Sequence, residues 1–126
     1  MKYAISSPNA PKPMGRTSQG TSAARYAFVS GQVGIDPALG SMAGDSCAVQ
    51  AEQAIRNVEA ILAEVECTLA DVTSATVYLT SMDDLAELER VWGELFPAPR
   101  PARTVVEVSR LEDPRACVAV SATACR

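Results

Sequence analysis

The chain has 126 residues, of which 48% are hydrophobic and 21% are charged, and its formal net charge is −4. These proportions are typical of one globular domain spanning residues 1–126 and exclude a disordered chain. A nucleic-acid partner is not expected, because a protein that binds the phosphate backbone needs a concentrated basic surface. Histidine is absent, which excludes Ser-His-Asp and Cys-His catalysis.

The cysteines and the N-terminal segment bear on cellular location. No pair of cysteines has Cys-x-x-Cys spacing, so we expect no metal site, and buried free thiols are favoured over two disulfides. The N-terminal segment has no apolar targeting region, and no apolar run approaches the ~18 residues of a membrane span. We therefore expect a soluble, cytoplasmic protein without a membrane partner. The cysteines are Cys47, Cys67, Cys117 and Cys125.

The first predicted elements are short. An apolar run at 3–6 is followed by a loop at 7–15, where prolines and a glycine interrupt regular structure. A strand is predicted over 25–29, and a turn follows at 36–40. Gly31 lies just after this strand, where a β-bulge or a close backbone approach to a ligand is expected.

Two helices are predicted from apolar residues at helical spacing. The first runs from about Asp45 to Cys67, with Asp45 or Ser46 as its cap. The second lies within 82–96, with Asp83 or Asp84 as its cap. Its apolar face contains Leu85, Leu88, Trp92 and Leu95.

Alternating and β-branched residues predict further strands over 72–80, 103–109 and 117–123. This order favours an α+β domain with both helices on one face of a mixed sheet. The other face would carry small or weakly polar residues, and such a face is better covered by another subunit than left bare. We therefore expect a closed homo-oligomer. The residues expected there are Ser74, Thr76, Tyr78, Thr80, Cys117, Ala119, Ser121 and Thr123.

Three stretches together resemble the RidA/YjgF family of reactive enamine/imine deaminases, also called L-PSP endoribonucleases. They are NAPKPMGRTSQG at 9–20, FVSGQVGIDPALG at 28–40 and RPARTVVEVSRL at 100–111, in the family's order and spacing. The resemblance implies a chorismate-mutase-like fold, assembled as a homotrimer with a β-barrel core and clefts between subunits. Members of the deaminating branch hydrolyse 2-imino acids to 2-keto acids and ammonia without metal or cofactor.

The resemblance also implies a substrate site. Arg103 matches the family's carboxylate-binding arginine, and a guanidinium can bind a carboxylate through two parallel hydrogen bonds. The residue pattern by itself also allows an arginine that is solvated or paired with Glu107. Gly31 and Ser30 match the segment whose backbone approaches the substrate. Val105 lies on the strand face of Arg103, where many deaminases have a cysteine and the backbone is the useful group.

The sequence departs from the deaminases at Ser121, where they carry a glutamate that orients the hydrolytic water. A serine hydroxyl can hydrogen-bond a water but cannot accept its proton at about pH 7. Glu89 lies where an asparagine is common, and it is either an exposed helix residue or a replacement carboxylate.

Two departures concern the mouth of the cleft. Arg16 and Thr17 replace a proline and a tyrosine, which removes an aromatic lid and adds either a second substrate-binding cation or a solvated loop charge. Trp92 replaces an aromatic residue that is usually tyrosine. The resemblance makes Trp92 and Thr17 candidates for binding the substrate, whereas the place of Trp92 on the apolar face of the helix favours core packing.

Three functions remain open on this basis. The first is a cofactor-independent imine/enamine deaminase with Arg103 and Ser121 as catalytic residues. The second is an enzyme that dehydrates, cyclises or tautomerises an imine-bearing carboxylate. The third is a trimer that binds a small carboxylate without turnover. Cleavage of RNA has the least support, because the chain is acidic and lacks both histidine and a basic aromatic surface.

Overall fold

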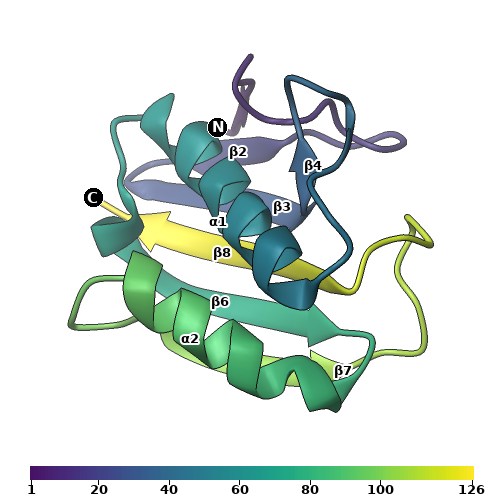
Figure 1. Cartoon of the computed structure of the whole chain (residues 1–126). Helices are drawn as coiled ribbons and strands as arrows, with labels where there is room; N and C mark the ends of the chain where they lie inside the picture. Colours follow the sequence, from purple (N-terminus) through teal and green to yellow (C-terminus); the bar gives the residue numbers. More distant parts are fainter.

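The computed structural model describes residues 1–126 as a six-stranded sheet with two α-helices on one face (Figure 1). The strands lie in the order β1-β2-β3-β8-β6-β7, and only β6 and β7 are parallel neighbours. The predicted α+β architecture is therefore confirmed. The strands of this sheet are β1 (Tyr3–Ile5), β2 (Gly20–Ala23), β3 (Tyr26–Val33), β6 (Val72–Leu79), β7 (Ala102–Glu107) and β8 (Val118–Cys125).

Helix α1 (Cys47–Ala63) begins where the sequence predicts and ends earlier. Ser46 is its cap, and the Ser46 hydroxyl accepts a hydrogen bond of 3.2 Å from the Val49 N–H group. Beyond the helix the chain turns through Glu66, whose φ of 60° lies in the left-handed region. The apolar face of α1 packs on β3 and β8 through fully buried residues: Ala51, Ala54, Ile55, Val58, Ile61 and Leu62.

Helix α2 (Leu85–Leu95) connects β6 to β7 and lies along these strands (Figure 1). A 3₁₀ turn, η2 (Met82–Asp84), leads into the helix, and another, η1 (Leu69–Asp71), precedes β6. A helical crossover of this kind is what allows β6 and β7 to run parallel. The buried residues of α2 are Leu88, Val91 and Trp92.

A separate two-stranded ribbon follows β3. It consists of β4 (Ile35–Asp36) and β5 (Ser41–Met42), joined by the turn predicted over 36–40. The Gly40 N–H group donates to the Asp36 carbonyl at 2.8 Å, and Gly40 has a φ of 71°. This left-handed conformation explains the glycine, because other residues adopt it at a steric cost.

The two faces of the sheet differ as predicted. Residues of β6 and β8 that point toward the helices are buried, for example Val77 and Val120, whereas Thr76 and Ser121 point to the opposite, open face. The prediction that Cys117 lies in a strand and on the open face is wrong. Strand β8 begins only at Val118, and Cys117 packs against the core on the helix side. On the open face β3 contributes two stacked aromatic rings, Tyr26 and Phe28, that are 49% and 44% exposed.

Two further expectations concern the cysteines and the helices. All four cysteines are free thiols. Cys47 and Cys67 are buried as predicted, whereas Cys117 and Cys125 are only partly buried. Neither α-helix combines the length and the hydropathy that crossing a membrane would require.

Candidate functional site

Arg103 lies on β7, the edge strand, and its side chain points toward α2. The strand register pairs Arg103 with Ala75, a residue of the helix-side core, and pairs Val105 with Val77 of the same core. Arg103 and Val105 thus share one face of β7, as the alternation predicted. The guanidinium of Arg103 forms an ion pair of 2.5 Å with Glu89 on α2.

The alternative prediction that Arg103 pairs with Glu107 is wrong. The Glu107 carboxylate instead accepts a hydrogen bond of 2.7 Å from the Met82 N–H group, at the start of η2. Glu107 therefore holds the turn that precedes α2, whereas Glu89 on that helix contacts the arginine.

The Trp92 ring lies close to the guanidinium of Arg103. Its ring centroid lies 5.0 Å from the Arg103 guanidinium carbon, within the range of a cation–π interaction. Trp92 is itself buried and stacks on Phe96 at a centroid distance of 4.2 Å. The core-packing interpretation of Trp92 is therefore confirmed, and the same ring also serves as a platform for the guanidinium.

The hydrogen bond from Arg103 lowers the pKa of Glu89, and burial opposes this shift only partly. Glu89 contacts one terminal nitrogen of the guanidinium, and the structure gives the remaining N–H groups no partner within the chain. A hollow of about 480 Å³ opens beside them. Arg100 lines the same hollow, but its guanidinium donates at 3.1 Å to the carbonyl of Gly93. Arg103 is therefore the arginine positioned to bind a further anion.

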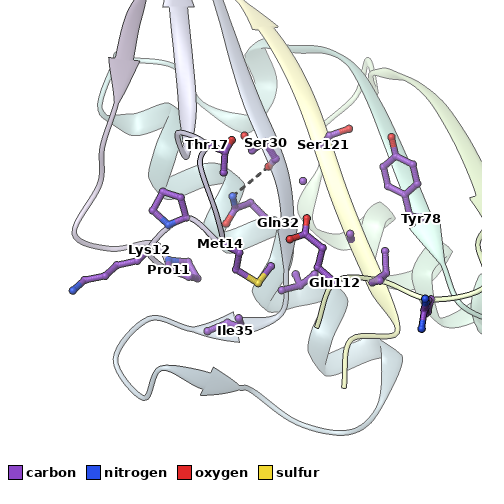
Figure 2. A pocket seen from close by; sticks show the side chains of 16 residues that line it. Pro11, Lys12, Met14, Thr17, Ser30, Gln32, Ile35, Tyr78, Glu112 and Ser121 are labelled. Carbon is purple, nitrogen blue, oxygen red and sulfur yellow. Dashed lines mark hydrogen bonds between the residues drawn. The ribbon is translucent and has the colours of Figure 1, made fainter. Parts of the chain in front are cut away.

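A second cavity of about 540 Å³ lies at the end of the open face (Figure 2). Its walls come from the N-terminal loop, from β3, from β8 and from the segment between β7 and β8. Four predicted site residues line it together: Thr17, Ser30, Gly31 and Ser121.

The bulge predicted at Gly31 is confirmed by a register shift between Val29 and Gln32. The Ser30 hydroxyl donates to the Ser18 carbonyl at 2.7 Å, which ties β3 to the N-terminal loop. A Cβ placed on Gly31 would meet no atom within 4 Å, and Gly31 does not have a positive φ. Packing within the chain therefore does not require glycine at this position.

Sequence reasoning missed three charged residues of this cavity: Lys12, Arg110 and Glu112. The Glu112 carboxylate points into the cavity, and Ser121 lies above it in the same view (Figure 2). The one sequence feature that could have identified Glu112 is its position directly after the stretch at 100–111, in the segment that leads to β8. Its location beside Ser121 depends on how that segment folds back.

The predicted site residues thus form two groups within one chain. Arg103, Val105 and Trp92 lie on the helix face at the β7 edge, whereas the side chain of Ser121 lies on the open face. Arg16 is exposed and lines neither cavity, which agrees with a solvated loop charge.

The family model of the endoribonuclease L-PSP proteins matches residues 7–126. A RutC family protein of Pyrococcus horikoshii is 42% identical over 111 residues, which cover 88% of each chain. The bovine 2-iminobutanoate/2-iminopropanoate deaminase is 35% identical over 107 residues, covering 85% of this chain and 78% of the relative.

Solved structures agree with these sequence relatives. RidA from an Antarctic Psychrobacter superposes with a TM-score of 0.94 at 30% identity, and 98% of each chain is covered. Escherichia coli TdcF with bound serine superposes with a TM-score of 0.89 at 28% identity, again covering 98% of each chain. From the order and register of its strands, its length and these relatives, the chain belongs to the endoribonuclease L-PSP family, which includes the RidA, YjgF and RutC proteins.

Proposed function

We propose that the protein hydrolyses reactive 2-imino acids to 2-keto acids and ammonia, with the substrate carboxylate bound by Arg103. The observation that carries this proposal is a guanidinium that lies over the Trp92 ring, already binds one carboxylate and lines a hollow. Arginine binds planar carboxylates through two parallel hydrogen bonds. The deaminase name of the bovine relative and the serine bound to TdcF support this substrate class.

The site would be shared between subunits of a homotrimer. The side chains of Arg103 and Ser121 point to opposite faces of the sheet in one chain, so two copies would have to meet for both side chains to act on one small substrate. The open face supports an assembly with a β-barrel core, because Tyr26 and Phe28 are exposed there among small residues. A groove of about 490 Å³ crosses this face, and both Arg103 and Ser121 contribute to its lining.

The reaction needs one water and one proton carrier. The water oxygen adds to the imine carbon and one of its protons passes to the imine nitrogen, which gives a carbinolamine. The carbinolamine hydroxyl then gives its proton to that nitrogen as the C–N bond breaks and the C=O bond forms, so ammonia and the keto acid are released. Ser30 and Ser121, with the backbone at Gly31, would hold the water in the cavity of the second copy. Glu112 would accept the proton from this water and return it to nitrogen, a role that a serine cannot perform.

The activity is tested with 2-iminobutanoate and 2-iminopropanoate, generated in place by threonine or serine dehydratase. The purified protein should accelerate keto-acid release beyond the rate of the buffer control. Release at the buffer rate with both substrates would refute imine hydrolysis.

A mixed-subunit assay tests the shared site. Arg103→Ala and Glu112→Gln chains are each expected to be inactive, but when they are unfolded together and reassembled, about one quarter of the interfaces should combine two intact halves. Activity near one quarter of the wild type supports the shared site. If both catalytic halves came from one chain, every site in the mixture would be defective and no activity would return.

A second function is favoured by the charges around Ser121. Lys12 and Arg110 line a cavity that lacks the family's glutamate, which suits a larger substrate with two anionic groups. Such a protein would dehydrate, cyclise or tautomerise an imine-bearing carboxylate, or only bind it. A dicarboxylate that raises the melting temperature of the wild type but not of Arg103→Ala, without any keto-acid release, would favour this function over deamination.

A further inference from the structure

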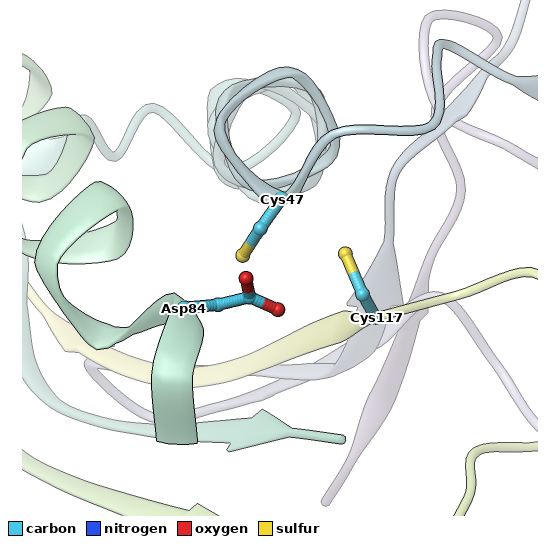
Figure 3. A group of neighbouring side chains, drawn as sticks. All are labelled: Cys47, Asp84 and Cys117. Carbon is cyan, nitrogen blue, oxygen red and sulfur yellow. The ribbon is translucent and has the colours of Figure 1, made fainter. Parts of the chain in front are cut away.

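Two thiols and a carboxylate meet between the two helices, away from both cavities described above. Cys47 lies in the first turn of α1, Asp84 lies at the start of α2, and Cys117 directly precedes β8. The two sulfur atoms and a carboxylate oxygen lie within 4.8 Å of one another (Figure 3). Because the three residues come from distant segments, their spacing along the chain carries no metal-site motif.

The carboxylate of Asp84 does not serve its own helix. Asp84 occupies the N-cap position of α2, where an aspartate usually accepts a hydrogen bond from a first-turn N–H group. It makes no such bond, and the turn before the helix is capped by the Ser81 hydroxyl, which accepts from the Asp83 N–H group at 3.2 Å. The Asp84 side chain points toward the two thiols (Figure 3). Helix capping therefore does not explain its orientation.

Cys117 is held in place by Gln50, which is fully buried on α1. The Gln50 amide oxygen accepts from the Cys117 N–H group at 2.8 Å and from its thiol at 3.1 Å. The Gln50 amide nitrogen donates to the carbonyls of Gly44 and Arg115, which fixes the orientation of the amide. The bond from the Cys117 N–H group does not depend on the thiol proton, so it fixes the backbone of this residue before a metal arrives, whereas the bond from the thiol is given up when the metal replaces the proton.

The backbone beside Gln50 is adapted to this arrangement. A Cβ on Gly34 would lie 2.6 Å from the Gln50 backbone, so only glycine allows the chain to pass so close to α1. The position of Gln50, and with it that of Cys117, is therefore set by close packing.

The cluster lacks a positive charge. Burial raises the pKa of the Cys47 thiol to about 12, and neighbouring Cys117 and Asp84 add to the effect. Burial also raises the pKa of Cys117, so both residues are neutral thiols beside a carboxylate. A bound divalent cation reverses this preference, because its charge stabilises thiolates that the bare site disfavours.

We propose that Cys47, Asp84 and Cys117 form a binding site for one thiophilic divalent cation, for which Zn²⁺ is the best match. Two sulfur ligands and one carboxylate oxygen suit zinc, and water can complete a tetrahedron. With Zn–S bonds of ~2.3 Å and Zn–O bonds of ~2.0–2.2 Å, small side-chain rotations would close the present separations around the ion. Binding releases the two thiol protons, and the ion would join α1, α2 and β8.

The test is a titration of the reduced, metal-free protein with Zn²⁺ in competition with a chromogenic chelator, and in parallel with Co²⁺. The wild type should bind about one Zn²⁺ per chain and, with Co²⁺, should develop a sulfur-to-cobalt charge-transfer band. Zn²⁺ should also raise the melting temperature.

Two double variants provide the matched comparison, since each removes two thiols. Cys47→Ala/Cys117→Ala should lose Zn²⁺ affinity by more than about 100-fold, whereas Cys67→Ala/Cys125→Ala should bind as the wild type does. Asp84→Asn, which keeps the shape of the side chain, should weaken binding by about tenfold or more while the circular dichroism spectrum stays unchanged.

Three results would overturn the proposal. The wild type could bind no Zn²⁺, or both double variants could lose binding equally, which would mean that the thiols act non-specifically. Alternatively, oxidised glutathione could convert Cys47 and Cys117 to a disulfide in a protein that binds no Zn²⁺ when reduced. That outcome would identify the pair as a redox couple.

Discussion

The β7 edge and the cavity beside β8 differ in how their charged groups are satisfied. At the β7 edge, Arg103 is held by an aromatic ring and by the carboxylate of Glu89, so its position is set before a substrate binds. In the cavity, the Glu112 carboxylate points into open space that Ser121 also lines (Figure 2). On the proposed function, the β7 edge would hold the substrate anion and the cavity would give room for the reaction, so neither region would be sufficient alone.

The largest loss of activity is expected from a substitution that separates the subunits of the proposed trimer. Phe28→Glu places a charge on the exposed sheet face, so the proposed trimer should dissociate and activity should be lost while the circular dichroism spectrum is retained. Sedimentation and the keto-acid assay measure both consequences. Val49→Glu is the matched control, because Val49 is 45% exposed on the helix side. A Phe28→Glu protein of wild-type size and activity would contradict the shared site.

The next effect concerns the β7 edge. Arg103→Ala removes the carboxylate-binding guanidinium, and kcat/KM should fall by about 10²-fold to 10⁴-fold, since each hydrogen bond to a charged group contributes about 1.5–3 kcal/mol. Arg100→Ala removes an arginine from the same hollow that already donates to a backbone carbonyl, so its activity should stay near that of the wild type. Equal losses in both variants would show that general positive charge, rather than a specific clamp, is responsible.

The cavity region is tested at Glu112. Glu112→Gln removes the proposed proton acceptor without changing the side-chain volume, and kcat should fall by about 10²-fold or more with KM little changed. Ser121→Ala should cost only about tenfold, because a hydroxyl that positions water contributes one hydrogen bond. A larger loss in Ser121→Ala than in Glu112→Gln would assign the water to the serine and leave the glutamate as a wall residue.

The smallest effect is expected at Glu89, the carboxylate on α2 that pairs with Arg103. Glu89→Gln frees Arg103 from its partner, and carboxylate ligands should bind about twofold to fivefold more tightly, the range of an exposed ion pair. Glu94→Gln is the control, because Glu94 pairs with Arg90 at 3.2 Å on the same helix without contacting Arg103. Calorimetric titration with a 2-keto acid measures the difference. Weaker binding by Glu89→Gln would mean that Glu89 positions the arginine rather than competing for it.

The Glu89–Arg103 pair also has a defined pH dependence. The folded-state pKa of Glu89 is lowered below 4.5, so the pair stabilises the fold above that pH and its contribution is lost as the pH falls through the lowered value. The melting temperatures of the wild type and Glu89→Gln should therefore differ at neutral pH and converge in acid. A difference that persists in acid would have a cause other than this ion pair.

Much of the fold could be predicted because its signals are local. The buried stripe of α1 and the alternation of β6 and β8 assigned the elements and the two faces of the sheet. The errors lie at the ends of elements. Helix α1 stops at Ala63, β8 starts at Val118, and β3 continues beyond the predicted end at Val29 to Val33. The strand β2 lies outside every predicted strand, because Gly20–Ala23 has no apolar alternation and is a strand only through pairing with β1 and β3.

The candidate site was predictable only in part. The residues Ser30, Gly31 and Thr17 were named from a resemblance and do line one cavity with Ser121. Glu112 was missed, because the segment from β7 to β8 has no periodicity that places its side chains.

The sequence by itself determined the elements, the two faces of the sheet and the shared strand face of Arg103 and Val105, since these follow from the repeat of each element. That this face of β7 is the helix side came from the structure. Only the tertiary structure decided that Arg103 meets Glu89 instead of Glu107, and that Cys47, Asp84 and Cys117 converge. The physical reason is the same in both cases. Contacts between distant segments depend on how helices pack on a sheet, and the local pattern of residues does not specify that geometry.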